Sequence, residues 1–235
     1  MDMPVNNSRL REISKFIKPG LSIADIGSDH ARLPLYLVEN ELVPWVIATE
    51  LGDGPYIRMQ RAVNASGFRE RIFSRQGNGL QVLCPGEVAG VVIAGMGGDL
   101  ITDILARDCV KAESFAYYVL QPMSRSRVLR KALAVRGWPI VDEALVIEKG
   151  QYYVIIHTRP GGEVYSLSNL EEELGPLVLR GSSPLKTDYL KYYLNKYKKV
   201  YGNLAKSNRA QALEIQDNIK ARIRELEAMI DAGKG

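Results

Sequence analysis

Short apolar runs rich in β-branched residues alternate with helical patterns through the first 160 positions of this 235-residue chain. Such alternation is typical of βαβ units, in which a helix returns the chain so that successive strands pair in parallel. Helical patterns are clearest in residues 33–42, 55–67, 99–108 and 125–137. The expected strands are residues 21–27, 43–51, 71–77, 88–96, 115–122, 138–148 and 151–159. The pattern therefore predicts an α/β fold with a mostly parallel sheet.

The ends of this sheet region carry further signals. Residues 9–20 predict an opening helix that ends at Pro19–Gly20. A short Glu-Lys-Gly turn joins the last two expected strands, which favours an antiparallel hairpin at the end of the sheet. A Pro- and Gly-rich linker begins at Arg159, so we place one domain at residues 1–160 and a second, helical domain at residues 161–235.

Apolar residues of the second domain recur every three or four positions, on either side of a break at Ser207–Asn208. This spacing predicts two coiled-coil-like helices packed as an antiparallel pair. Because two helices bury little surface alone, the pair is expected to dock on the sheet domain or on another copy of the chain. The sequence is therefore compatible with a monomer and with a homodimer. The expected seam consists of Leu190, Leu194, Tyr197, Tyr201, Leu204, Ala212, Ile215, Ile219, Ile223, Leu226 and Ile230.

The net charge of +4 is unevenly distributed along the chain. Residues 186–235 carry 11 Lys and Arg against 6 Asp and Glu, whereas residues 1–185 carry 20 against 21. A basic C-terminal region indicates an acidic partner, of which nucleic acid is the commonest, or else a well-solvated helical hairpin.

Several classes of protein are disfavoured. There is no apolar run near 18 residues, and the N-terminal residues lack the apolar stretch of a secretory signal, so we expect no membrane span. Cys84 and Cys109 lack metal-ligand spacing. They are expected to be free thiols in a reducing, cytoplasmic setting, and we expect no metal site.

The loops after the first four strands are the expected ligand loops, because open parallel sheets bind ligands at the carboxyl ends of their strands. In the first loop, "DIGSDHARLP", Asp25 ends the strand and Gly27 permits a tight turn. A dinucleotide loop would carry glycine where Asp29 and Ala31 stand. The acidic loop suits a cationic ligand such as S-adenosylmethionine, although an ordinary strand-to-helix turn remains the alternative.

The next three loops complete a nucleoside site. Glu50, 25 residues after Asp25, ends the second strand, where an acidic residue commonly binds both ribose hydroxyls. Asn78, within Gly77–Asn78–Gly79, offers a donor and an acceptor to an adenine edge. Gly95–Met96–Gly97–Gly98 lets the chain pass close to a flat group, with Met96 as an apolar wall. The alternatives are that Glu50 is a solvated charge, that Asn78 belongs to a simple turn, and that residues 95–98 form a flexible turn.

Polar and basic residues follow the fifth strand. Gln121 stands at the same rim, beside a basic cluster that either contacts nucleic-acid phosphates or forms the solvated face of a helix. The cluster consists of Arg125, Arg127, Arg130 and Lys131.

Together, the motifs "DIGSDHARLP", "GNGL", "VIAGMGG" and "LQP", in this order, resemble the bacterial tRNA (adenine-22-N1)-methyltransferase family, TrmK. The family's first loop is close to D-I-G-S-D-H-A-x-L-P, matched here at every fixed position, and the resemblance extends over nearly the whole chain. It implies a Rossmann-like class I methyltransferase sheet with a C-terminal helical pair. Asn78 stands where the family more often has aspartate, and its carbonyl can still accept from an adenine amino group.

The resemblance implies an enzyme that methylates adenine N1 in tRNA with S-adenosylmethionine. N1 has its own lone pair, so alignment and electrostatics are the enzyme's task. We assign the catalytic role to Asp29 and His30; alternatively Asp29 binds the cofactor's ammonium group or caps the helix. The target adenine must leave its stack, and Tyr36, Tyr56 or Met96 is expected to support it.

The site prediction has two parts. The cofactor set is Asp25, Gly27, Ser28, Asp29, His30, Glu50, Leu51, Gly77, Asn78, Gly79, Ala94, Gly95, Met96 and Gly97. The substrate set is Gly98, Gln121, Arg125 and Arg127. The alternatives are a methyltransferase acting on another RNA base or a small molecule, a nucleotide-dependent dehydrogenase, and a non-catalytic nucleotide- or RNA-binding protein.

Overall fold

The structure is a computed structural model that describes residues 8–204 and 210–232. The predicted helix break at Ser207–Asn208 lies outside these residues. The chain divides into two compact units, Met1–Leu177 and Val178–Gly235. The first holds the sheet, and the second holds the two long C-terminal helices.

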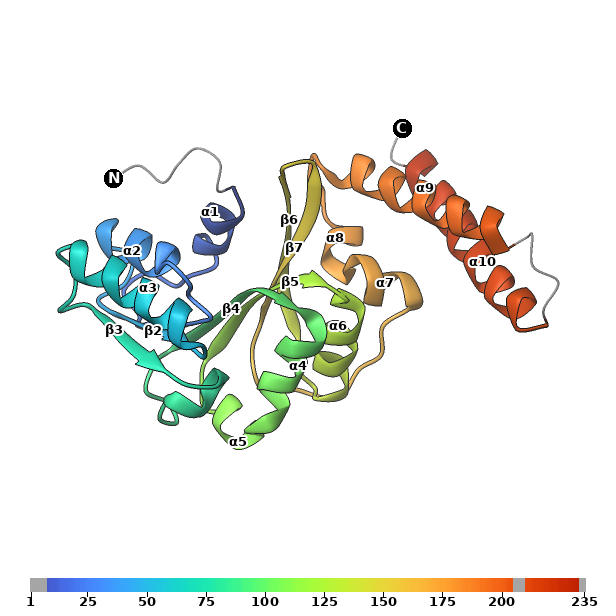
Figure 1. Ribbon diagram of the computed structural model, residues 1–235. Coiled ribbons are helices and arrows are strands. Elements are labelled where there is room, and N and C mark those ends of the chain that lie inside the picture. Colours follow the sequence, from blue (N-terminus) through green and yellow to red (C-terminus); the bar gives the residue numbers. More distant parts are fainter. Residues whose placement is uncertain (1–7, 205–209, 233–235) are drawn as a thin grey trace. The chain divides into compact units, whose positions relative to one another are not determined.

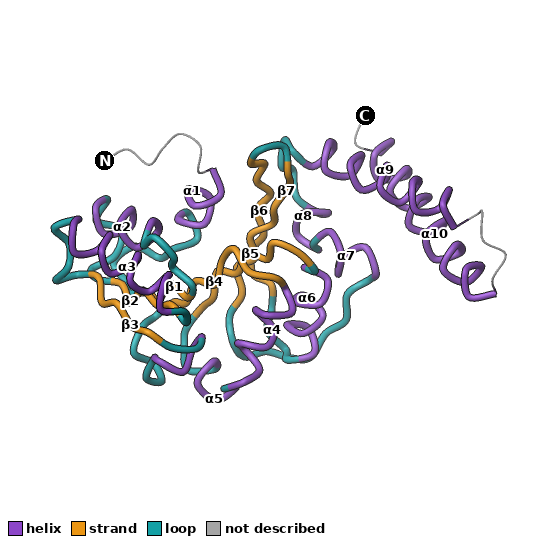
Figure 2. The backbone as a smooth tube through the Cα atoms, viewed as in Figure 1, coloured by secondary structure: helices purple, strands orange, loops and turns teal. Residues whose placement is uncertain are grey.

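A seven-stranded sheet of order β3-β2-β1-β4-β5-β7-β6 forms the first unit (Figures 1 and 2). β1 to β5 pair in parallel, whereas β7 runs antiparallel to both β5 and β6. The strands are β1 Ile23–Ile26, β2 Val46–Glu50, β3 Ile72–Gln76, β4 Gly90–Gly97, β5 Tyr117–Ser124, β6 Ile140–Glu148 and β7 Gln151–Thr158. All seven predicted strands and the antiparallel hairpin are confirmed.

Helices cover both faces of this sheet. Right-handed crossovers place α2 and α3 on one face, and α4 and α6 on the other. α1 packs against α2 and the β6–β7 hairpin, while α7 packs against α6. The helices of this unit are α1 Ser8–Ser14, α2 Arg32–Glu39, α3 Asp53–Ala65, the 3-10 helix η1 Gly79–Val82, α4 Gly98–Arg107, α5 Cys109–Ala112, α6 Ser126–Val135 and α7 Asn169–Leu174, with α8 Pro176–Arg180 at the boundary.

The opening helix is shorter than predicted. α1 ends at Ser14, and residues 15–17 continue as turns held by hydrogen bonds three residues back, such as Phe16 N–H to the Ile13 carbonyl at 3.1 Å. Ile13 and Ile17 are nevertheless both buried in the core under α1 and α2, so the apolar spacing that predicted a helix is satisfied by helix and turn together.

One predicted surface cation is a core residue. Arg130 of α6 is fully buried, and its Nε lies 2.8 Å from Oε1 of the equally buried Glu143 on β6. Its Nη1 also donates to the backbone carbonyls of Glu172 and Glu173 at 3.0 Å. This corrects the predicted basic cluster, because a guanidinium enclosed by a carboxylate and two carbonyls contacts neither phosphate nor solvent.

The second unit is the predicted antiparallel helix pair, α9 Lys186–Leu204 and α10 Ala210–Ala232 (Figure 1). Lys198 Nζ lies 2.7 Å from Glu227 Oε1, and Arg222 lies over the Tyr197 ring at 5.7 Å. Of the described seam residues, Leu190, Tyr197, Ile219, Leu226 and Ile230 are buried. Ile215 is 49% exposed, because it lies at the end of the pair, next to the Gln216 side chain that donates to the Leu204 carbonyl.

In the part of the chain that the structure describes, no helix is both long and apolar enough to cross a membrane. Nor do the described residues include a group of three or more His, Cys, Asp or Glu side chains that would hold a metal ion. Cys84 and Cys109 are exposed free thiols.

Candidate active site

Four loops meet where the strand order reverses, between β1 and β4, which is where open α/β sheets bind ligands. Backbone hydrogen bonds tie these loops together. The N–H groups of Gly27 and Ser28 both donate to the Thr49 carbonyl at 3.0 Å, and Gly77 N–H donates to the Glu50 carbonyl at 2.8 Å. The ends of β1, β2 and β3 are therefore held in a fixed relation.

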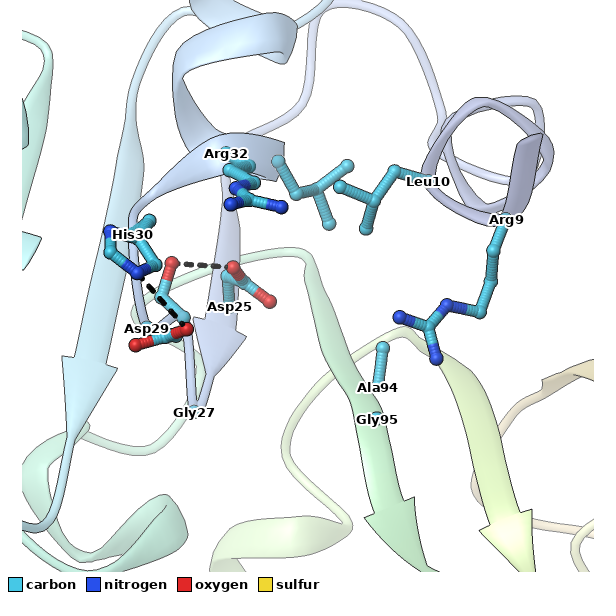
Figure 3. A pocket seen from close by; sticks show the side chains of 11 residues that line it. Arg9, Leu10, Asp25, Gly27, Asp29, His30, Arg32, Ala94 and Gly95 are labelled. Carbon is cyan, nitrogen blue, oxygen red and sulfur yellow. Dashed lines mark hydrogen bonds and ion pairs between the residues drawn. The ribbon is translucent and has the colours of Figure 1, made fainter. Parts of the chain in front are cut away.

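The first of two neighbouring cavities has a volume of about 250 Å³ and opens between the β1 loop, the β4 end and α1 (Figure 3). Carboxylates of the β1 loop stand on one side and the Arg9 guanidinium on the other. Its lining is Arg9, Leu10, Asp25, Gly27, Ser28, Asp29, His30, Arg32, Leu33, Ala94 and Gly95.

The second cavity, of about 110 Å³, lies on the β2 and β3 side and is mostly apolar, with Glu50 and Asn78 among its polar groups. Gly27 belongs to both cavities. A side chain at Gly27 would collide with the terminal methyl group of Met96, and its φ of +76° also favours glycine. The lining is Ile26, Gly27, Thr49, Glu50, Leu51, Gly77, Asn78, Gly79, Met96, Leu100 and Ile104.

Asp25 is a buried carboxyl at the floor of the first cavity, only 5% exposed. Burial raises the pKa of Asp25, the hydrogen bond from Ser28 lowers it and the charge of Glu50 raises it, and the net result is a pKa of about 6. Ser28 Oγ donates to Asp25 Oδ2 at 2.6 Å. The group therefore changes charge state near neutral pH, and a cation bound beside it would favour the ionised form.

Glu50 and Asp29 are linked through the backbone, because Asp29 N–H donates to Glu50 Oε1 at 2.5 Å. Asp29 has a left-handed conformation with φ of 48°, which Asp tolerates better than most residues. Its side chain is 56% exposed and lies 3.2 Å from Arg58 Nη2 and 3.6 Å from His30 Nε2. The N-cap of α2 is Ala31, without a side-chain cap hydrogen bond. The helix-cap interpretation of Asp29 is therefore wrong.

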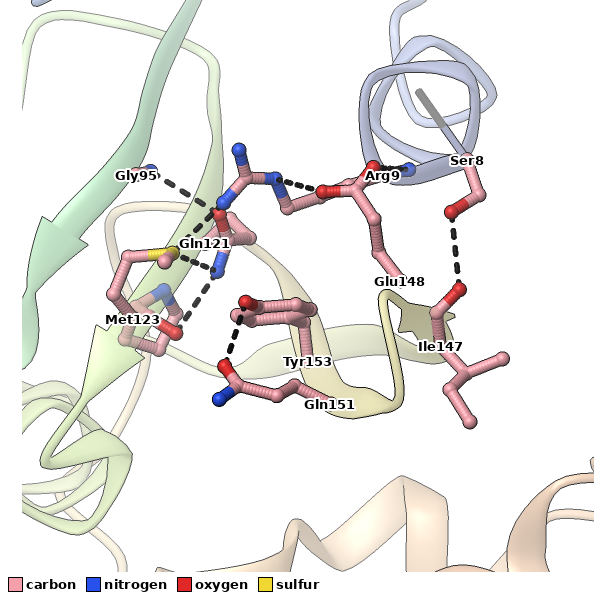
Figure 4. A network of polar contacts seen from close by, with 10 residues as sticks. Ser8, Arg9, Gly95, Gln121, Met123, Ile147, Glu148, Gln151 and Tyr153 are labelled. Atoms are coloured by element: carbon pink, nitrogen blue, oxygen red, sulfur yellow. Dashed lines mark hydrogen bonds and ion pairs between the residues drawn. The ribbon is translucent and has the colours of Figure 1, made fainter. Parts of the chain in front are cut away.

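The end of β4 is irregular, with register shifts against β5 on both sides of Met96. Pro122, the residue paired with Met96, has no N–H for the strand ladder. The buried Gln121 side chain joins the two strands at this irregularity: its Oε1 accepts from Gly95 N–H at 3.1 Å, and its Nε2 donates to the Pro122 carbonyl at 2.9 Å (Figure 4). Gln121 thus fixes the loop that lines the first cavity.

The sequence gives no signal for Arg9 as a site residue, because its neighbours are distant along the chain. Its Nη1 lies 2.8 Å from Met123 Sδ, and its guanidinium lies 5.3 Å from the centre of the Tyr153 ring. Figure 4 shows this side chain reaching from α1 toward the ends of β5 and the hairpin. Arg32 and Leu33 also line the first cavity, and Thr49, Leu100 and Ile104 the second.

The predicted cofactor set gathers at these cavities: each member except Gly97 lines one or both. Met96 lines the second cavity, whereas Tyr36 and Tyr56 pack against the core.

The four predicted substrate residues line neither of the two cavities. Gly98 is buried where a side chain would collide with the Arg125 carbonyl, and Gln121 lies beneath the β4 loop. Arg125 pairs with Asp99 at 3.0 Å, and Arg127 with Glu172 at 2.9 Å.

The strand order, the antiparallel hairpin and the ligand loops at the β1–β4 reversal define a class I methyltransferase fold. The chain belongs to the tRNA (adenine(22)-N(1))-methyltransferase family, TrmK, whose model matches residues 23–225. This confirms the resemblance carried by the loop motifs.

Individual relatives agree with the family assignment. The chain is 36% identical to the Bacillus subtilis tRNA (adenine(22)-N(1))-methyltransferase over 172 residues, which is 73% of this chain and 72% of that protein. The crystal structure of B. subtilis TrmK is 30% identical, with a TM-score of 0.84 over 94% of this chain and 97% of that one. A Streptococcus pneumoniae relative, solved in complex with S-adenosyl-L-methionine, is 32% identical, with a TM-score of 0.79 over 94% of this chain and 98% of that one.

Proposed function

We propose that this protein transfers a methyl group from S-adenosylmethionine to N1 of adenine 22 in tRNA, the reaction that names its family. One observation carries the proposal: the loops of the family motifs meet around two adjoining cavities at the reversal of strand order. The first of these loops begins at Asp25 and the last ends at Gly98, so only the folded sheet brings them together.

The residues present fit this cofactor. The first cavity has the carboxylates of Asp25 and Asp29, which suit an ammonium or sulfonium group. The second offers Glu50 and Asn78 for the hydroxyls and ring edge of a nucleoside between apolar walls. Gly27 borders both cavities, and the methyl group of Met96 occupies the space above it, so a ligand that spans both cavities displaces this flexible side chain. When bound, S-adenosylmethionine supplies an electrophilic methyl group.

The chain's own residues then have two tasks. Adenine N1 has an in-plane lone pair, so no side chain has to remove a proton; the protein aligns the base and offsets the positive charge that it acquires. We assign the second task to Asp29, helped by His30, because both line the first cavity and are about half exposed at its mouth. Arg58 donates to Asp29 Oδ1 at 3.2 Å, and His30 Nε2 lies 3.6 Å from Asp29 Oδ2.

The C-terminal domain, residues 161–235, is proposed to bind tRNA, and residues 1–160 to bind the cofactor. The C-terminal pair combines excess positive charge with surface tyrosines, a composition suited to phosphates and unstacked bases. For example, Lys196 lies 5.1 Å from the centre of the Tyr193 ring, and Tyr192 is 51% exposed. Because its substrate is tRNA, we place the protein in the cytoplasm, as a monomer or a homodimer.

Incubation with methyl-labelled S-adenosylmethionine and an unmodified tRNA transcript tests the function. Nucleoside analysis is expected to show 1-methyladenosine, and primer extension is expected to stop at position 22. A transcript with guanine at that position is the matched control and is expected to stay unlabelled. Label at another base, or on a small molecule alone, would favour one of the other methyltransferase functions, and binding of S-adenosylmethionine without transfer would favour a non-catalytic protein.

A further inference from the structure

The loop that carries Asp29 has an unfavourable backbone conformation. Asp29 and Ala31 are both left-handed, with φ of 48° and 52°, and neither is glycine. Asp tolerates this conformation better than Ala, whose side chain can form no compensating hydrogen bond. Such residues persist where the surrounding structure holds them in place, and they cluster at catalytic and ligand sites. The loop therefore depends on the contacts that its backbone makes.

Hydrogen bonds from this loop to the end of β2 supply that support. The N–H groups of Gly27 and Ser28 donate to the Thr49 backbone carbonyl. The N–H of Asp29, the next residue, donates instead to a side chain, Glu50 Oε1, at 2.5 Å. A hydrogen bond to a carboxylate is stronger than one to a neutral acceptor. The backbone position of Asp29 therefore depends on where the Glu50 carboxylate lies.

Glu50 connects the two cavities. Its side chain lines the second cavity but not the first, whereas Asp29 lines the first but not the second. Oε1 of Glu50 accepts from the Asp29 N–H, and in the part of the chain that the structure describes no group donates to Oε2. The second oxygen is therefore available to a ligand hydroxyl. One carboxylate can thus bind a ligand in one cavity and hold the backbone of a residue in the other.

The other contacts of Asp29 support it less. Arg58 Nη2 donates to Asp29 Oδ1 at 3.2 Å, and the two side chains are 49% and 56% exposed. His30 Nε2 lies 3.6 Å from Asp29 Oδ2, too far for a hydrogen bond (Figure 3). Exposed ion pairs contribute little in water, and both of these act on the side chain instead of the backbone. Glu50 is therefore the group that determines where the loop presents the Asp29 carboxylate.

We propose that Glu50 is a positioning residue for Asp29, in addition to its expected contact with the ribose hydroxyls. The inference rests on the proposed function and deepens it. A nucleoside in the second cavity fixes the Glu50 carboxylate, and this carboxylate fixes the backbone of Asp29 in the first cavity. Asp29 is thereby set in place for the target adenine only when the second cavity is occupied.

Two nucleosides that differ only in the ribose hydroxyls test this coupling without turnover. Adenosine and 2′,3′-dideoxyadenosine would each be added at saturating concentration to the isotope-labelled full-length protein, and NMR would follow hydrogen exchange of the Asp29 amide. Adenosine is expected to slow this exchange about threefold to tenfold, because it fixes the acceptor of the amide, and dideoxyadenosine is expected to leave it unchanged.

Two variants remove the acceptor in steps. Glu50→Ala is expected to exchange the Asp29 amide faster than the wild type even without a ligand, and adenosine is expected to have no effect on it. Glu50→Gln, which keeps an oxygen acceptor without the charge, is expected to lie between Glu50→Ala and the wild type. The ligand-free comparison requires no nucleoside binding, so it remains decisive if Glu50→Ala binds adenosine too weakly.

Glu70→Ala is the matched control, since Glu70 is an exposed carboxylate that pairs with Arg69 and lines neither cavity. It is expected to respond to both nucleosides as the wild type does. Faster exchange with adenosine in the wild type would overturn the inference, because the ribose would then draw Glu50 away from the amide. Equal ligand-free exchange in Glu50→Ala and the wild type would overturn it as well.

A double-mutant cycle separates positioning from ribose binding. At saturating S-adenosylmethionine, Asp29→Asn is expected to lower kcat about one-hundredfold in the wild type but less than about threefold in Glu50→Ala, because the loop there no longer presents the carboxylate. Additive losses would limit Glu50 to cofactor binding and overturn the inference. A wild-type protein that forms no 1-methyladenosine would refute the proposed function, and the exchange measurement would still decide the link between Glu50 and Asp29.

Discussion

The side-chain oxygen of Gln121 accepts a hydrogen bond from the backbone N–H of Gly95 at 3.1 Å, across the irregular pairing of β4 with β5. Gly95 has no partner in the strand register, which shifts between Ala94 and Met96, so the Gln121 side chain supplies the acceptor for its N–H. It joins a residue that the sequence suggested as a substrate contact to a loop that lines the first cavity, and it makes Gln121 a positioning residue.

Replacement of Gln121 by leucine is expected to lower both stability and turnover. The Gly95 N–H would lose its acceptor, at a cost of about 0.5 to 1.5 kcal/mol in the free energy of unfolding. The loosened loop would lower kcat for tRNA methylation more than the affinity for S-adenosylhomocysteine. Urea unfolding, turnover and titration measure the three quantities. Gln60→Leu, an exposed glutamine on α3, is the control; a Gln121→Leu protein with normal turnover would contradict the positioning role.

The buried carboxyl of Asp25 predicts a pH-dependent stability. Burial raises its pKa from 3.8 to about 6, so the folded state holds the proton more tightly than the unfolded state. The stabilisation by this proton is complete below about pH 4 and is lost as the pH rises through 6. Asp25→Asn, which cannot ionise, is therefore expected to be more stable than the wild type by about 3 kcal/mol at pH 8 and about equally stable at pH 4.

Urea unfolding at several pH values checks this expectation in the ligand-free protein. Ser28→Ala removes the hydrogen bond that lowers the pKa of Asp25, so its pH dependence is expected to shift toward higher pH. Parallel stability profiles for the wild type and Asp25→Asn would show that Asp25 has an ordinary pKa in solution.

The role proposed for Asp29 is tested by Asp29→Asn rather than by alanine alone. Asparagine tolerates the left-handed backbone at this position and keeps the size of the side chain, so it removes charge without strain. Turnover on tRNA is expected to fall about one-hundredfold with little change in melting temperature. Asp103→Asn, on the exposed side of α4, is the control. Wild-type turnover in Asp29→Asn and in Asp29→Ala would remove Asp29 from the mechanism.

Deletion of residues 186–235 is expected to separate RNA binding from cofactor binding. These residues carry the basic excess of the chain and belong to the second compact unit. The truncated protein is expected to lose tRNA affinity by tenfold or more at a fixed salt concentration while binding S-adenosylhomocysteine normally, because phosphate contacts dominate such affinity. Equal tRNA affinity of the two proteins, measured by filter binding, would place the RNA site on the first unit.

The buried ion pair of Arg130 and Glu143 is expected to be structural. Arg130→Met would leave the Glu143 carboxylate enclosed without the guanidinium that balances its charge, at a cost of about 3 to 5 kcal/mol in the free energy of unfolding. Lys131→Ala, at the exposed neighbouring position, is expected to change stability by less than about 0.5 kcal/mol. Thermal and urea unfolding distinguish the two, and a fully stable Arg130→Met protein would show that the pair is dispensable.

The sequence pattern predicted the central strands well because β1, β2, β4 and β5 are buried along most of their length. Ile23, Val46 and Val92, for instance, are fully buried, so these strands are continuous apolar runs. The loops at the reversal of strand order were predicted from the same alternation, because open parallel sheets place their ligand loops at the carboxyl ends of the strands. Because β1, β2 and β4 are adjacent parallel strands, their carboxyl ends lie at the same edge of the sheet and bring Asp25, Glu50 and Gly95 together.

Contacts between segments that are distant in the sequence could not be predicted from the sequence pattern. Arg9 reaches Met123 and Glu148 only because α1 packs on the hairpin, and nothing in residues 9–20 indicates that docking. Arg130 lies in an ordinary basic helix pattern, and only the pairing of the sheet with α6 and α7 encloses it. The left-handed turn at Asp29 and Ala31 likewise lies beside hydrogen bonds from the β1 loop to the Thr49 carbonyl and the Glu50 side chain, which no local pattern predicts.

The methyl group of Met96, which fills the space above Gly27, has a consequence for inhibitor design. Because Gly27 borders both cavities, each can accept a small fragment while Met96 stays in place, whereas a linked compound has to displace this flexible side chain. Joining two fragments gains from effective concentration only if the linker matches the span. We therefore expect a linked compound to bind Met96→Ala more tightly than the wild type, whereas its separate halves bind both proteins equally. The difference measures the binding free energy that is lost when Met96 is displaced.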